Sequence, residues 1–132
     1  MSFVVGLKVL NEKDYLQEIL QQFYKHCDSL LIVEGADSYM RKATSRISSE
    51  GLSTDGTTEI IKSFPDPEGK IEYAPMGFYQ EEDEGIQRMM QGLKAGDVLW
   101  TASGDEFFFD DDIIKVKEYM ETTSYLTLEF PF

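Results

Sequence analysis

The sequence predicts an α/β fold in which a mostly parallel sheet is flanked by helices. Short apolar runs bounded by turn residues, such as residues 98–102 between Gly96 and Gly104, are typical of buried parallel strands. Stretches with apolar residues at helical spacing lie between these runs, so strands and helices alternate along the chain. The 132 residues are enough for one domain with one core.

The chain is strongly acidic, with a formal net charge of −13. A surface of this charge repels phosphate backbones, so we do not expect general binding to nucleic acids. A diphosphate ligand would need a metal ion or a local arginine to offset the same field. The other interpretation of the acidic charge is that it only keeps the protein soluble.

The composition predicts a cytoplasmic protein without a transmembrane segment. No apolar run approaches the roughly 20 residues of a membrane span. The first residues lack the basic segment of a signal peptide and enter a strand at once. The single cysteine, Cys27, excludes an internal disulfide framework.

The first third of the chain predicts a βαβ unit. Residues 3–10 are apolar and rich in β-branched side chains, which indicates a strand, and Asn11 is a good candidate to cap the following helix. Residues 29–33 predict a second strand, with Glu34 at its carboxyl end. A strand, a helix and a strand in about 30 residues imply parallel strands and a right-handed crossover. The apolar stripe of the helix comprises Leu16, Ile19, Leu20, Phe23 and Tyr24.

Residues 35–52 show no clear period and form a basic island in an acidic chain. The cations are Arg41, Lys42 and Arg46, accompanied by several serines. One interpretation is a loop that folds over a phosphate-bearing ligand. The other is a mobile insertion, which the missing periodicity favours.

The middle of the chain continues the alternation. Residues 53–58 form a turn rich in capping residues, which leads into a short helix over residues 59–64. Within this turn, Asp55 either caps the helix or fixes a loop that contacts a ligand. Residues 65–69 end the helix, and residues 70–73 predict a third strand.

The remaining elements are a helix whose first turn is the acidic run 81–84, a strand over 98–102, a helix capped by residues 110–112 and a last strand over 124–130. The first of these helices contains Arg88 among apolar positions. Its guanidinium either pairs with Glu84, four residues earlier, or clamps a diphosphate.

Candidate ligand-binding residues follow the predicted strands. Ser103, Gly104, Asp105 and Glu106 come directly after the strand 98–102, and ligands of open α/β sheets bind beyond the carboxyl ends of strands. Two carboxylates beside a glycine are compatible with a divalent-metal site, or with a solvated loop. Glu34 is expected at the same edge, where it would accept hydrogen bonds from a base or ribose or be merely solvated. The glycine-rich phosphate loops of dinucleotide-binding and P-loop proteins are absent from the sequence.

Five segments of the chain form a recognisable set: residues 9–12, 32–34, 53–57, 87–88 and 96–107. Taken together, they resemble the nucleotide-binding half of family 2 glycosyltransferases, which have the GT-A fold. The resemblance spans nearly the whole chain, and the S-T-D-G-T turn and the order of the segments are its most specific parts.

The resemblance implies transfer of a sugar from a nucleotide diphosphate donor, usually with Mn²⁺ or Mg²⁺. Residues near Leu10 would lie against the base, and Glu34 would take the place of the acid that contacts it. Asp55 would shape the nucleotide pocket, and Arg88 would face the donor. The last two places of the D-x-D metal motif correspond to Gly104 and to Asp105, the expected metal ligand.

Three departures from the family pattern matter. Ser103 replaces the first aspartate of D-x-D, and Met89 stands where an asparagine commonly follows the arginine. The chain ends soon after the metal motif, so the acceptor-binding half with its catalytic base is expected to be missing. Enzymatic activity of this chain alone is therefore an open question.

Three functions stay open at this point. The first is the donor-binding half of a glycosyltransferase, inverting as is usual in the family, with an unknown acceptor. The second is a non-catalytic domain of the same fold that binds nucleotide or a protein partner. The third is a nucleotidyltransferase of similar fold, although residues 11–14 lack the glycine-rich basic loop of those enzymes.

A truncated sheet predicts self-association. Without further strands, apolar side chains near the C-terminus, such as Tyr125, Leu126 and Phe130, would be exposed along an open edge. We expect light scattering to show a mass that grows with protein concentration. A clean monomer at high concentration would contradict this expectation.

Overall fold

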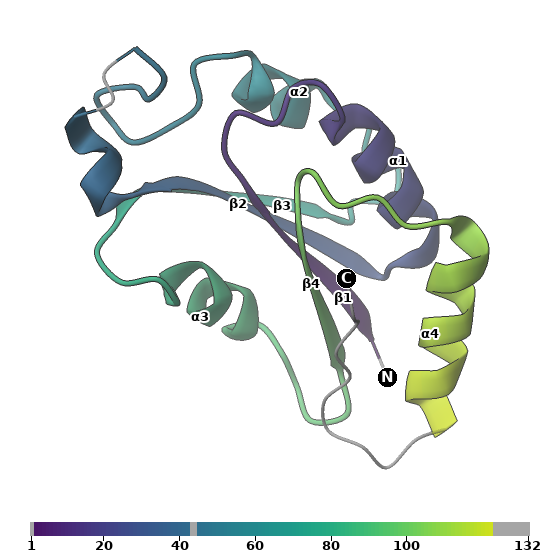
Figure 1. Cartoon of the computed structure of the whole chain (residues 1–132). Helices are drawn as coiled ribbons and strands as arrows, with labels where there is room; N and C mark the ends of the chain where they lie inside the picture. Colours follow the sequence, from purple (N-terminus) through teal and green to yellow (C-terminus); the bar gives the residue numbers. More distant parts are fainter. Residues whose placement is uncertain (1, 43–44, 123–132) are drawn as a thin grey trace.

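The computed structural model describes residues 2–42 and 45–122, which are arranged around a four-stranded parallel sheet. The strand order is β3-β2-β1-β4, and each neighbouring pair is parallel. The predicted α/β class with a parallel, helix-flanked sheet is therefore confirmed (Figure 1). The strands are β1 (Phe3–Val9), β2 (Ser29–Asp37), β3 (Ile71–Tyr79) and β4 (Val98–Ser103).

Helices cover both faces of the sheet. The helices α1 (Leu16–His26), α2 (Thr57–Ser63) and α4 (Asp110–Thr122) lie on one face, and α3 (Glu84–Met90) lies on the other (Figure 1). A short 3₁₀ helix, η1 (Ser38–Lys42), follows β2. No helix among residues 2–42 and 45–122 is long and apolar enough to cross a membrane.

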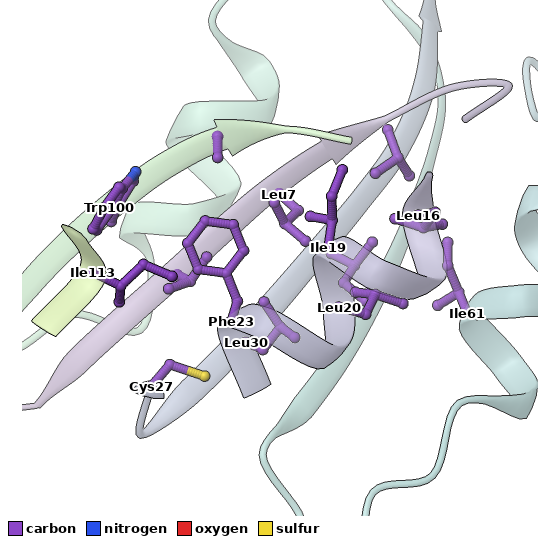
Figure 2. Packing of buried hydrophobic residues seen from close by; sticks show 14 of the residues in the cluster. Leu7, Leu16, Ile19, Leu20, Phe23, Cys27, Leu30, Ile61, Trp100 and Ile113 are labelled. Carbon is purple, nitrogen blue, oxygen red and sulfur yellow. The ribbon is translucent and has the colours of Figure 1, made fainter. Parts of the chain in front are cut away.

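The main core lies between the sheet and the face covered by α1. Leu20 and Phe23 of α1 pack toward the strands, as Figure 2 shows, and the Phe23 ring meets the Trp100 ring edge-on at 5.7 Å between centroids. The predicted apolar stripe of this helix is thus the face that it buries, except that Tyr24 is only half-buried. A smaller cluster, centred on Met89, fills the space beneath α3.

Two strands are longer than the sequence predicts. β2 continues to Asp37, so Glu34 lies inside the strand instead of at its end. β3 continues from the predicted residues 70–73 to Tyr79, and its pairing with β2 skips one residue between Pro75 and Gly77. Pro75 has no N–H group that could donate a hydrogen bond to a neighbouring strand. A proline is tolerated here because β3 is an edge strand and Pro75 lies beside the bulge.

Two helix starts also differ from the predicted ones. Asn11 does not cap α1, which begins at Leu16, and Asn11 instead adopts a left-handed conformation with φ of 52°. In the acidic run 81–84, only Glu84 belongs to the first turn of α3. α4 begins at Asp110 as expected, whereas the predicted last strand and its exposed edge lie outside the described residues.

The helix α3 approaches the sheet where β1 has no side chain. A Cβ atom on Gly6 would lie 2.4 Å from Sδ and 2.9 Å from Cγ of Met89. Met89 is almost fully buried, so it has little room to move away. Gly6 therefore sets the distance between β1 and α3.

We predict that Gly6→Ala lowers the free energy of unfolding by about 1–3 kcal/mol, because the added methyl group overpacks the contact with Met89. Chemical denaturation measures the change. Gly92→Ala is the matched control, since a Cβ there meets no atom within 4 Å. A second substitution, Met89→Ala, should cost less stability in the Gly6→Ala background than in the original chain, because it makes room for the methyl group, and equal costs in the two backgrounds would contradict this account of the contact.

Candidate functional site

The candidate site lies at the carboxyl edge of the sheet, where three loops meet. They follow β1 (residues 10–15), precede α2 (residues 45–56) and follow β4 (residues 104–106). Parallel strands end at the same edge, and the register pairs Val9 of β1 with Glu34 of β2 and Lys8 with Ser103 of β4. Loops from distant parts of the sequence are thereby brought together.

Asn11 joins the first loop to the second. Its amide N–H donates to Ser53 Oγ (2.9 Å), and its side-chain Oδ1 accepts from the Thr54 amide (3.0 Å). Its Nδ2 donates to the Arg46 carbonyl (2.7 Å), which also accepts from Thr54 Oγ1 (2.9 Å). The left-handed conformation of Asn11, which asparagine adopts more readily than most residues, makes these contacts possible.

Asp55 fixes the turn before α2. Its Oδ1 accepts from the amide (3.0 Å) and the hydroxyl (2.6 Å) of Thr57, and its Oδ2 accepts from the Lys13 amide (3.2 Å). Burial raises the pKa of this carboxyl group, but the hydrogen bonds from Thr57 and Lys13 outweigh it and lower the pKa overall. Asp55 stands one residue before the N-cap Gly56, so it satisfies the first helical amide and ties the loops together at once.

Glu12 packs directly against the loop after β4. A Cβ atom on Gly104 would lie 2.8 Å from Cγ of Glu12 and 2.9 Å from Cγ1 of Val9. The amide of Glu12 donates to Thr57 Oγ1 (2.8 Å), which fixes its position from the other side. Gly104 is therefore required for a close approach between the β1 and β4 loops.

Asp105 is the exposed acid of the β4 loop. Its neighbour Gly104 still donates its amide to the Lys8 carbonyl (3.1 Å), so Asp105 is the first residue beyond this contact with the sheet. The side chain of Glu106 is directed back toward β4, because its carboxylate accepts a hydrogen bond from the Ser103 amide (2.9 Å). Of the two carboxylates expected to form a metal site, only Asp105 stands out from the loop.

Glu12, Asp55 and Asp105 form an acidic group at this edge. The pKa of the Glu12 carboxyl group is raised to about 7 from its ordinary value of 4.5, first by burial and then by the negative charges of Asp105 and Asp55. Glu12 was not among the site residues predicted from the sequence. Its place directly after the first strand, within the segment 9–12, was the signal that could have selected it.

Glu34 lies beneath these loops and is fully buried. Its carboxyl group accepts from the Ser53 amide (2.9 Å), from Thr58 Oγ1 (2.8 and 2.9 Å) and from the Tyr73 hydroxyl (2.5 Å). Burial and the adjacent Glu34 raise the pKa of Tyr73, so its hydroxyl stays a donor. Glu34 thus holds the turn before α2 onto the sheet, and its contact with a base stays a prediction.

The other two selected residues lie differently. Leu10 is half-buried directly after β1, beside Asn11, and so belongs to the loop cluster.

Arg88 lies outside the loop cluster. It lies on α3, across the sheet from α1, and forms an ion pair with Glu72 near the start of β3. Glu84, its expected partner, instead accepts from the amides of Gln80 and Glu81.

The described part of the chain contains no group of three or more Asp, Glu, His or Cys side chains placed to hold a metal ion. A single exposed carboxylate, such as that of Asp105, leaves most of the coordination sphere of a divalent ion to other ligands. Phosphate oxygens and water are the usual ones for Mg²⁺.

Comparisons with known proteins do not assign the chain to a family: no family model, no curated protein and no solved structure matches it. Proposals about its function therefore depend on the residues and their geometry.

The raised pKa of Glu12 predicts a pH-dependent cost to stability. The native state keeps this proton up to about pH 7, whereas the unfolded chain releases it near 4.5, so stability falls as the pH rises through this range. Glu12→Gln keeps the aliphatic part of the side chain that packs on Gly104 but removes the charge. At about pH 8 we expect the free energy of unfolding of this variant to be about 1 kcal/mol higher than that of the original chain, after discounting for solvent screening. At about pH 4 the variant and the original chain should be equal.

Urea denaturation at the two pH values measures this difference. Glu18→Gln, an exposed position on α1, is the control for loss of one negative charge. An equal gain for both variants at high pH would show that general repulsion, and not the site, is responsible.

Proposed function

We propose that the chain binds a nucleotide diphosphate sugar and belongs to a glycosyltransferase of the GT-A type. The observation that carries the proposal is the placement of Asp105 at the carboxyl edge, beside Gly104 and next to the loop that holds Asp55. The sheet order and the S-T-D-G-T turn that precedes α2 accord with the resemblance noted in the sequence.

In this proposal, each loop has a distinct part in donor binding. The backbone near Leu10 lies against the base, and Asp55 holds the nucleotide loop in shape through Thr57 and Lys13. Glu34 acts from below, because its buried carboxyl group anchors Ser53 and Thr58. A site built this way is held in position before the ligand arrives, which reduces the entropic cost of binding.

A divalent cation fits the donor set of this edge. Carboxylate oxygens are hard ligands that suit Mg²⁺ and Mn²⁺, and Asp105 offers one on an exposed loop. The acidic group of Glu12, Asp55 and Asp105 would repel a diphosphate that arrived without a cation. Bound with the donor, the ion would act as a Lewis acid that stabilises the departing nucleotide diphosphate.

The proposal covers donor binding and not proton abstraction. Transfer to an acceptor hydroxyl needs a general base within hydrogen-bond reach of that hydroxyl. We assign no residue of this chain to that role, so the acceptor and the inverting outcome implied by the family resemblance stay predictions.

The second candidate is a domain that keeps the fold and binds nucleotide or a partner without catalysis. Two observations favour it: Ser103 removes one carboxylate from the metal motif, and Glu106 is occupied by the Ser103 amide. The two functions differ in a measurable way, because a catalytic chain should turn over the donor whereas a binding domain should not.

Calorimetric titration of UDP, GDP and dTDP, each with and without Mn²⁺, tests the proposed function. We expect one nucleotide to bind only with the metal. Asp105→Ala should weaken that binding about ten-fold or more, since it removes the exposed carboxylate ligand.

Asp111→Ala is the matched control, because it removes an exposed acid from the first turn of α4. Binding that is equally strong without metal, or equally weakened in both variants, would contradict the assigned role of Asp105. Binding of none of the three nucleotides would refute the donor-binding proposal. Hydrolysis of the matching nucleotide sugar, lost in Asp105→Ala, would exclude the non-catalytic alternative.

A further inference from the structure

A pocket of about 280 Å³ opens at the β3 side of the carboxyl edge. Its lining comes from three separate parts of the chain: Arg41 in η1, residues 47–49 in the loop before α2, and Phe78 in β3. β3 and β4 are the two edges of the sheet, three strand spacings or about 14 Å apart. The pocket is therefore distinct from the loop that carries Asp105.

The walls of this pocket are held by close backbone packing. A Cβ atom on Gly51 would lie 2.5 Å from the Phe78 amide nitrogen, and one on Gly77 would lie 2.9 Å from the Glu50 carbonyl oxygen. Both glycines have positive φ, of 82° and 71°. Only residues without a side chain allow the loop and the strand to approach this closely, so these two walls are held against each other beside the pocket.

The chemistry of the lining suits an anion. The Arg41 guanidinium lies over the Phe78 ring, with 4.2 Å between Cζ and the ring centroid. Within residues 2–42 and 45–122 this guanidinium has no carboxylate partner. Stacking on an aromatic ring leaves the N–H groups along the edge of an arginine free to bind phosphate or carboxylate.

Hydroxyl groups stand beside this guanidinium. Ser48 Oγ accepts from the amides of Glu50 (3.3 Å) and Leu52 (3.0 Å), so its own proton is left for a ligand. Ser49 adds a second, exposed hydroxyl group. Three of the chain's 12 lysines and arginines fall at positions 41, 42 and 46, which makes this the basic part of a chain with net charge −13.

We propose that this pocket binds the phosphate group of a small phosphate ester. The tetrahedral phosphate has enough oxygens to take two N–H groups of Arg41 and the serine hydroxyls together. The volume is at the lower limit of ligand pockets and suits a molecule about the size of glycerol phosphate better than a nucleotide. The site needs no metal ion and does not depend on the proposed donor site.

Titration followed by ¹H–¹⁵N spectra tests the proposal, with EDTA present and ionic strength held constant. The probes are inorganic phosphate, glycerol 3-phosphate and acetate. We expect saturable shifts of the Ser48, Ser49 and Phe78 amides with both phosphates below about 20 mM, and weaker or no binding of acetate.

Variants separate this pocket from general attraction. Arg41→Gln should weaken phosphate about ten-fold or more, and Ser49→Ala a few-fold, because each removes a donor. Lys115→Gln, an exposed position on α4, should bind as the original chain does. A spectrum typical of the folded chain is required of each variant, so that a loss of binding can be assigned to a local change.

Three results would overturn the proposal: no saturable shifts at the pocket amides, equal weakening in Arg41→Gln and Lys115→Gln, or acetate binding as tightly as glycerol 3-phosphate. If nucleotides with Mn²⁺ fail to bind while phosphate saturates the pocket, the donor proposal fails alone and this one stands.

Discussion

The buried carboxyl group of Glu34 is the constraint on which the candidate site depends. It lies in the middle of β2 with no exposed surface, and its donors come from a loop, from α2 and from β3. A buried polar group of this kind is costly unless its hydrogen bonds are made, so the three elements must stay in place around it. The turn with Asp55 is consequently fixed relative to the sheet, and so is the loop after β1 that Asp55 and Thr57 hold.

Electrostatic repulsion gives the site its second constraint. Folding brings Glu12, Asp55 and Asp105 together in a chain that is already strongly acidic, and the pKa of Glu12 rises as a result of burial and of these charges. Such an arrangement works against stability on its own. A cation would relieve the repulsion, which is the physical reason to expect that an anionic ligand bound beside these three carboxylates binds together with a metal ion.

Most of the fold could be predicted because its strands are apolar runs between turn residues and α1 has one apolar stripe. The ends of β2 and β3 could not be predicted, because Pro75 and the glycines at 35 and 77 are not typical of strands and residues 35–37 pair with residues 77–79 only beyond a bulge. Glu12 was missed because its position depends on the missing side chain of Gly104, 92 residues away in the sequence. The partner of Arg88 was missed because helical spacing indicates Glu84, while tertiary packing brings Glu72 closer.

The proposed donor site and the phosphate pocket share a loop. Arg46, whose carbonyl oxygen is held by Asn11 and Thr54, lies one residue before the pocket residue Ile47, and Ile47 forms a β-bridge with Ser53. Ser53 in turn contacts both Asn11 and Glu34. A ligand that fixed residues 47–49 would therefore act on the same hydrogen bonds that position the turn before α2. Any coupling of this kind is reciprocal, so a nucleotide that tightened Asn11 and Ser53 would favour phosphate in the pocket to the same degree.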